Sequence, residues 1–176
     1  GEADTISAAV LTMQSQGSSY LYFGHVGQLL LGEELARQGV TPSLDYVLRD
    51  VEMRLEIALY LVRDGTAGQA MKAAAQDGSA TDRLEALAED VGLTADTMTR
   101  SVKEVLSDLE DRGASFAPAL AADGSLTAAG YGILEDGSLA AWADREAALG
   151  INLILSRVDA DVVELTPEGE SPAALR

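Results

Sequence analysis

The sequence predicts an all-α fold, an antiparallel helical bundle of about four main helices with a long irregular crossover before the last helix. Apolar residues recur at steps of three and four along most of the chain, which is the period of an amphipathic helix. No stretch alternates apolar and polar residues with β-branched enrichment, and residues 161–165 are the single short strand candidate. We expect one helical-bundle domain over residues 1–165 and a solvated C-terminal tail over residues 166–176.

The longest expected helix runs from Asp4 to Gln38, where a stripe of apolar or small residues follows the helical period. Asp4 or Thr5 caps its start, and Gly39 ends it. Glycines inside the stripe each weaken a helix by about 1 kcal/mol relative to alanine, so we expect a break or kink near residues 17–19.

The remaining helices are placed by their start signals. Thr41-Pro42 opens a second helix, because threonine is a good N-cap and proline suits the first helical position, and its apolar stripe runs to Val62. Ser79 with Asp82 three residues later resembles a capping box and opens a third helix, and Thr94 caps a fourth. The irregular crossover covers residues 114–137, and the last helix begins at Ser138.

Composition excludes several classes of function. Twelve basic residues against 29 acidic ones give a formal net charge of -17, which argues against nucleic acid and anionic membranes as partners. There is no cysteine, and His25 is the single histidine, so a two-histidine metal site and thiolate chemistry are excluded. Ten arginines against two lysines indicate a bacterial genome rich in GC, and we favour a periplasmic or secreted location, although residues 1–4 show no signal peptide.

Residues 5–32 contain no Asp, Glu, Lys or Arg, which is unusual in so acidic a chain. The segment holds too many Ser, Thr and Gln residues to span a membrane. A helix without a charged face is expected to be hidden from water, either by its own fold or by another subunit. We therefore expect a homo-oligomer, such as a homodimer, or a protein partner that packs along this segment.

A polar but uncharged face lies within that segment. Tyr22, His25 and Gln28 follow one another at steps of three, with Tyr20 at the margin of the face. We interpret Tyr20, Tyr22, His25 and Gln28 as a candidate lining for a small-ligand cavity. The more ordinary interpretation is a buried histidine whose hydrogen bonds are satisfied by its neighbours.

These observations predict a non-enzymatic, acidic helical-bundle protein that binds or assembles through its charge-free N-terminal helix. The alternative is a metal- or cofactor-binding bundle that uses His25 with nearby tyrosines or carboxylates, and the sequence does not identify the cofactor. We assign no catalytic residue, because the chain lacks a nucleophile elbow, a P-loop and a dinucleotide fingerprint. A hydrolase or lyase that uses two of the 29 carboxylates stays open as a third possibility.

Overall fold

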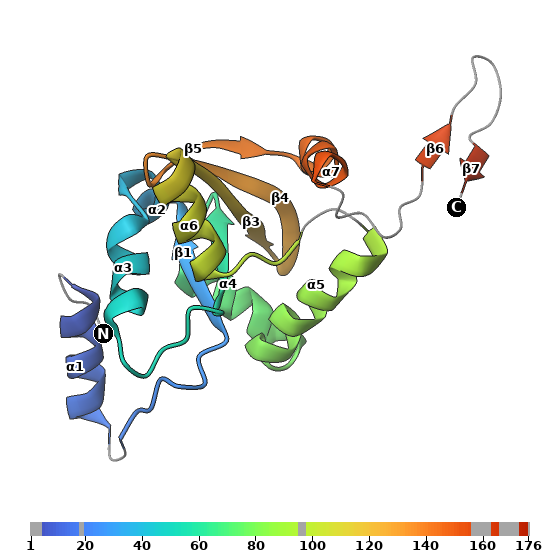
Figure 1. Cartoon of the computed structure of the whole chain (residues 1–176). Coiled ribbons are helices and arrows are strands. Elements are labelled where there is room, and N and C mark those ends of the chain that lie inside the picture. The colour runs from blue at the N-terminus through green and yellow to red at the C-terminus, as the bar shows by residue number, and fades with distance from the viewer. Residues whose placement is uncertain (1–4, 18–19, 95–97, 156–162, 166–172, 176) are drawn as a thin grey trace.

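The computed structural model describes residues 5–17, 20–94, 98–155, 163–165 and 173–175. Its centre is a five-stranded mixed β-sheet with helices on both faces (Figure 1). The expected all-α bundle is therefore wrong, and the chain has an α/β fold.

The elements follow one another along the chain with these bounds: α1 Ile6–Gln16, β1 Gln28–Gly32, α2 Glu33–Gln38, α3 Thr41–Arg49, β2 Ala58–Arg63, α4 Ala67–Ala74, the 3-10 turn η1 Ala75–Asp77, α5 Ala80–Thr94, α6 Val102–Arg112, β3 Ala114–Asp123, β4 Ser125–Glu135, β5 Ser138–Ala143, α7 Arg145–Ile154, β6 Val163–Leu165 and β7 Ala173–Leu175.

The large sheet has the strand order β1-β2-β3-β4-β5. Strands β1, β2 and β3 are parallel, whereas β3, β4 and β5 form two successive antiparallel hairpins. The β1–β2 ladder joins five residue pairs, but the β2–β3 ladder joins only three, from Leu61–Ala119 to Arg63–Ala121. The remaining strands, β6 and β7, pair with each other in a separate two-stranded ribbon.

Alternate residues of the strands supply two apolar faces. On one face, Leu59 and Leu61 of β2 pack in a cluster with residues of α2, α3 and α6. On the other face, Tyr60 and Val62 pack with residues of α4 and α5, and a third cluster joins α7 to β4. Strand β2 is thus buried on both sides, which is typical of a parallel strand in an α/β protein.

The prediction of one long first helix is wrong, because the described part of residues 4–38 forms three separate elements. Helix α1 ends at Gln16, and the charge-free segment then continues into strand β1 and the short helix α2. Three consecutive leucines at 29–31 form the centre of β1, and such a continuous apolar run suits a strand covered on both faces. Helix α1 has no buried residue, so the fold of this chain does not hide it from water, and its burial by another subunit stays a prediction.

The predictions of the second helix and of the last helix are also wrong, because each predicted helix includes a strand. Helix α3 begins at Thr41, as expected, but it ends at Arg49, and the apolar run that follows is strand β2. The expected crossover at 114–137 is the hairpin of β3 and β4. Residues from Ser138 form β5, and α7 begins only at Arg145, where Asp144 accepts a hydrogen bond from the Ala147 amide as the N-cap.

Both Asp-Gly pairs of the expected crossover are hairpin turns. Gly124 joins β3 to β4, while Asp136 and Gly137 join β4 to β5, and all three have positive φ angles. The second turn is fastened to its surroundings, because the Gly137 carbonyl accepts a 2.7 Å hydrogen bond from the Val40 amide. The Asp136 amide donates another, also of 2.7 Å, to the Gly113 carbonyl at the end of α6.

Other expectations hold at the level of single elements. Helix α5 begins directly after Ser79, as expected, and α6 ends at Arg112 before a left-handed glycine. The N-cap of α6 is Ser101 rather than Thr94. Strand β6 lies within the predicted candidate at 161–165, of which residues 161–162 lie outside the described residues. Of the expected tail, residues 166–172 and 176 are also outside them, and residues 173–175 form β7, so the domain boundary stays a prediction.

The Glu33 carboxylate ties three strand ends together. Its Oε2 accepts a 2.7 Å hydrogen bond from the Asp64 amide after β2, and its Oε1 accepts from Arg37 at 2.8 Å and from the Trp142 indole of β5 at 3.3 Å. Partial burial alone would raise the pKa of this carboxyl, but the hydrogen bonds to the ionised form outweigh it and lower the pKa below its ordinary value.

We expect Glu33→Gln to lower the free energy of unfolding at pH 7 by about 1 to 2 kcal/mol, because hydrogen bonds to a charged acceptor are lost. A carboxyl with a lowered native pKa stabilises the fold above its unfolded-state pKa, and this contribution disappears as the pH falls through the native pKa. Urea unfolding of both proteins at pH 7 and pH 3 therefore gives a difference that shrinks at pH 3. Glu34→Gln, at an exposed neighbour, is the control and shows no such trend.

Gly130 lies where β4 passes close to the end of β5. Its φ is +81°, and an added Cβ would approach the Ala143 carbonyl oxygen, a backbone atom that no side-chain rotation can move away. Gly124 has a similar φ of +73°, but a Cβ there meets open space. The two glycines therefore separate the cost of the left-handed backbone from the cost of a steric clash.

We expect Gly124→Ala to destabilise the protein by about 1 kcal/mol, the cost of a left-handed alanine. Gly130→Ala adds the clash and costs more than about 3 kcal/mol. Chemical denaturation measures both values, and equal losses for the two variants would contradict the close approach of β4 and β5.

Candidate functional site

A cavity of about 670 Å³ opens beside the first half of β3, at the side of α6. We call it the Arg100 pocket. Its lining comes from the segment before β2, the residues just before α6, α6 itself, β3 and the end of α7: Glu56, Arg100, Ser101, Lys103, Glu104, Ser107, Asp108, Arg112, Phe116 and Leu155.

The pocket exists because the sheet divides between β2 and β3. Before Leu61, the edge of β2 pairs with the residues that lead into α6 rather than with β3. The Leu59 amide donates to the Arg100 carbonyl at 2.8 Å, and the Val102 amide donates to the Ile57 carbonyl at 2.9 Å. The first half of β3 is thereby separated from β2, and its Phe116 ring lies beside the Arg100 side chain.

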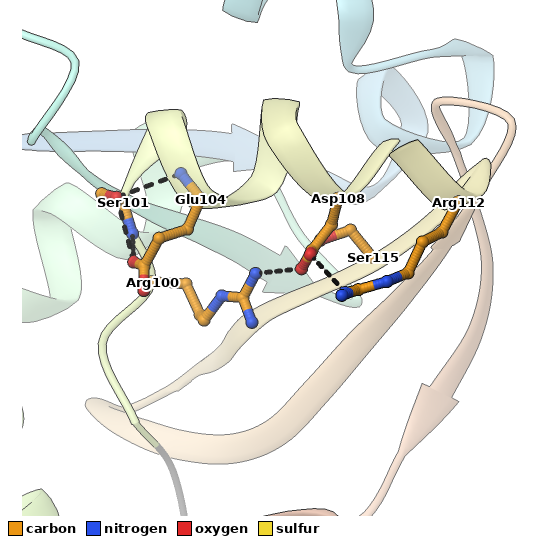
Figure 2. Close-up of polar contacts among 6 residues, drawn as sticks. All are labelled: Arg100, Ser101, Glu104, Asp108, Arg112 and Ser115. Atoms are coloured by element: carbon orange, nitrogen blue, oxygen red, sulfur yellow. Dashed lines mark hydrogen bonds and ion pairs between the residues drawn. The ribbon is translucent and has the colours of Figure 1, made fainter. Parts of the chain in front are cut away.

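One carboxylate serves two guanidinium groups in this pocket. Asp108 Oδ2 accepts a 2.5 Å hydrogen bond from Arg100 Nη2, and its Oδ1 accepts a 2.7 Å bond from Arg112 Nη1 (Figure 2). The Ser115 hydroxyl, at the start of β3, lies 3.4 Å from Asp108 Oδ2. Asp108 therefore connects α6 to Arg100, two residues before the helix, and to Ser115 of β3.

Arg100 is an unusually buried charge. The residue is only 5% exposed, and its guanidinium carbon lies 4.4 Å from the centre of the Phe116 ring, within the range of a cation–π contact. Its Nε is buried and has no hydrogen-bond partner in the protein. A buried donor without an acceptor costs about 1 to 3 kcal/mol, so an acceptor oxygen at this atom, from a water molecule or a bound group, would stabilise the site.

The local sequence explains how Arg100 is held in place. Ser101 and Glu104 form a capping box, in which the Ser101 hydroxyl accepts from the Glu104 amide and the Glu104 carboxylate accepts from the Ser101 amide at 2.8 Å (Figure 2). This box fixes the start of α6. Asp108 and Arg112 then follow at a spacing of four residues, on one face of the helix.

A smaller cavity of about 330 Å³ lies at the C-terminal ends of β1 and β2, between the starts of α2 and α4. Gly32, Gly65 and Thr66 contribute to its lining. None of its lining residues is buried, so it offers no charged or polar group that is shielded from water. The Arg100 pocket is the stronger candidate.

The predicted site residues lie elsewhere. Tyr20, Tyr22 and His25 are exposed in the irregular segment after α1, and Gln28 is the first residue of β1, so they do not share a helix face. The Tyr22 and His25 rings meet edge to face with centres 5.7 Å apart, whereas the Tyr20 hydroxyl donates to Glu52 at 2.7 Å. None of the four lines the Arg100 pocket, and a ligand at these residues stays a prediction.

Within the described ranges, no group of three or more His, Asp or Glu side chains is arranged to hold a metal ion. The same part of the chain contains no helix with the length and apolar character needed to cross a bilayer.

Comparison with known proteins connects this fold to a family. The family described as "Spore germination protein N-terminal domain" matches residues 1–122, which is more than half of the 176 residues. The chain belongs to this family.

A solved structure, described as the crystal structure of the GerBC protein, resembles this spore germination domain with a TM-score of 0.64. The match covers 96% of this chain and 47% of the GerBC chain, so the domain spans about half the length of that relative. At 16% identity the likeness shows a common fold. No curated protein matches the chain.

These findings correct the predicted function. A spore germination N-terminal domain with a GerBC-like α/β fold is not a helical bundle that assembles through a charge-free helix. The alternative, a metal- or cofactor-binding bundle around His25, is wrong for the same reason, since the bundle does not exist.

Sequence reasoning missed the Arg100 pocket entirely. Two signals were present: a Ser-x-x-Glu capping box directly after Arg100, and an Asp-x-x-x-Arg pair within the same helix. Both are common on helices whose function is only structural, and the burial of Arg100 depends on the division between β2 and β3, which the sequence does not show.

We expect Asp108→Asn to lower the free energy of unfolding by about 2 to 3 kcal/mol, because it leaves the buried Arg100 guanidinium without its carboxylate. Asp45→Asn removes the same kind of arginine pair at an exposed position of α3 and costs less than about 0.5 kcal/mol. Guanidinium chloride unfolding compares the two variants. Similar small losses in both would contradict the buried role of Arg100.

Proposed function

We propose that this chain is a domain of a germinant receptor subunit, and that it binds another protein subunit within the receptor complex. The observation that carries the proposal is the family match over residues 1–122, supported by the GerBC-like fold over nearly the whole chain. Such a domain acts through its surface rather than by catalysis.

The end of α7 supplies a surface suited to a protein partner. Leu153, Ile154 and Leu155 are 58%, 84% and 44% exposed, so three successive apolar side chains face water. Leu155 also borders the Arg100 pocket, which places an apolar patch next to arginine and phenylalanine side chains. Apolar groups around arginine and aromatic residues are the usual centre of a protein–protein interface.

The first test is genetic, in the spore-forming host. Deleting the gene should slow the fall in optical density of spores after germinant addition, and the wild-type gene should restore it. Affinity purification of the tagged protein from solubilised spore membranes should recover the other receptor subunits, identified by mass spectrometry. Normal germination with every germinant together with no recovered subunit would show the proposal to be wrong.

A pair of variants tests the surface. We expect Ile154→Asp to reduce recovery of the receptor subunits about tenfold or more, because a charge in an apolar interface costs at least about 1.4 kcal/mol. Leu48→Asp, at a half-exposed leucine of α3 on the opposite face of the sheet, is the matched control and leaves recovery unchanged. Circular dichroism confirms that both variants are folded. Equal recovery with both would place the interface elsewhere.

A further inference from the structure

We propose that the Arg100 pocket is a binding site for a monocarboxylate whose carboxylate is held by the Arg100 guanidinium and whose apolar part lies against Phe116 and Leu155. This inference rests on the contacts inside the pocket and not on the proposed receptor role.

The first argument is the unsatisfied donor. Arginine carries five N–H donors in a planar fork and has no means of losing its charge. Asp108 reaches Nη2 of Arg100, but Nε has no acceptor although it is buried. Glu56 and Glu104 also line the pocket, and neither bonds to Nε. An oxygen acceptor that enters the pocket would complete this fork.

The second argument is charge. Both oxygens of Asp108 are already engaged, one by Arg100 and the other by Arg112. The Arg100 guanidinium, which is shielded from water, therefore shares its carboxylate with Arg112, and Lys103, Glu56 and Glu104 complete a lining of three positive and three negative charges. A buried charge is stable when it is paired, which favours an anion of one unit. A multiply charged anion is disfavoured, because the chain as a whole carries -17.

The third argument is shape. A cavity of about 670 Å³ lies within the size range of small-molecule sites, and its lining residues are mainly polar but include an apolar part formed by Phe116 and Leu155. Phe116 is half-buried and Leu155 is exposed at the mouth, so an aliphatic group next to the carboxylate would lose water contact there. The carboxylate could belong to a free small molecule or to an acidic residue of another protein.

The direct test observes Arg100 in the unaltered protein. In 15N-labelled protein, the Arg100 Nε–H resonance is followed by NMR while butyrate, acetate, butyramide or inorganic phosphate is added at constant ionic strength. We expect butyrate to shift this resonance in a saturable way and acetate to bind more weakly. Butyramide has the same shape without the charge and should leave the resonance unchanged.

A capped tetrapeptide with one glutamate and one leucine, beside its glutamine counterpart, distinguishes the two sources. Binding of butyrate indicates a free small molecule, and binding of the glutamate peptide alone indicates a protein side chain; either result supports the carboxylate site. No response of Arg100 to butyrate and to the peptide, or an equal response to butyramide, overturns it, and a water molecule then satisfies Nε.

Variants test the charge argument. Arg112→Gln should raise the Kd for butyrate at least fivefold, because Asp108 then neutralises Arg100 alone. Arg49→Gln is the matched control, since Arg49 is also an exposed arginine paired with an aspartate four residues earlier, and it leaves the Kd unchanged. Equal Kd values for both variants would contradict the idea that Arg112 competes with Arg100 for the Asp108 carboxylate. All these measurements use the isolated chain, so their failure is distinct from a failure of receptor assembly.

Discussion

The carboxylate of Asp108 is the contact on which the arrangement of this half of the molecule depends. It joins α6 to Arg100 on one side and lies within reach of Ser115 at the start of β3. Helix α6 begins beside the edge of β2 and ends where β3 begins. The Asp108 contact therefore keeps the first half of β3 apart from β2, and the two strands pair only from Leu61 and Ala119 onward. A continuous β2–β3 ladder would bring the start of β3 to the edge of β2 and leave no room for the guanidinium.

The division of the sheet also explains the chemistry of the pocket. The Ile57 carbonyl and the Leu59 amide are satisfied by the segment that leads into α6, so these main-chain groups of the β2 edge are paired although β3 is absent there. The side chains of the same segment are then free to line the opening. The Arg100 guanidinium can be buried there because Asp108, eight residues later in α6, supplies its counterion.

Single helices and caps of this chain are readable from its sequence, but its sheet is not. Ser79, whose hydroxyl accepts from the Asp82 amide, and the glycine after Arg112 mark real helix ends, because these signals act through local hydrogen bonds. Strands β1 and β2 are short apolar runs covered on both faces, which periodicity does not distinguish from buried helix. The Asp-Gly pairs at 123–124 and 136–137 are typical hairpin signals, but they lie in the segment for which the sequence predicts an irregular crossover. The candidate site depends on the division between β2 and β3, so no local pattern indicates it.

The two Asp-Gly turns have the same sequence, but they differ in how well they tolerate insertions and substitutions. The tip at Gly124 stands clear of other atoms, so this loop can accept inserted residues, such as an epitope or a fluorescent tag, without disturbing the domain. The tip at Asp136 and Gly137 is held by one main-chain bond to the α2–α3 junction and by another to the end of α6, and a side chain at Gly137 would meet Thr41. Lengthening that loop would detach the edge hairpin from both neighbouring helices, so natural variation in loop length should accumulate at the first tip and be absent from the second.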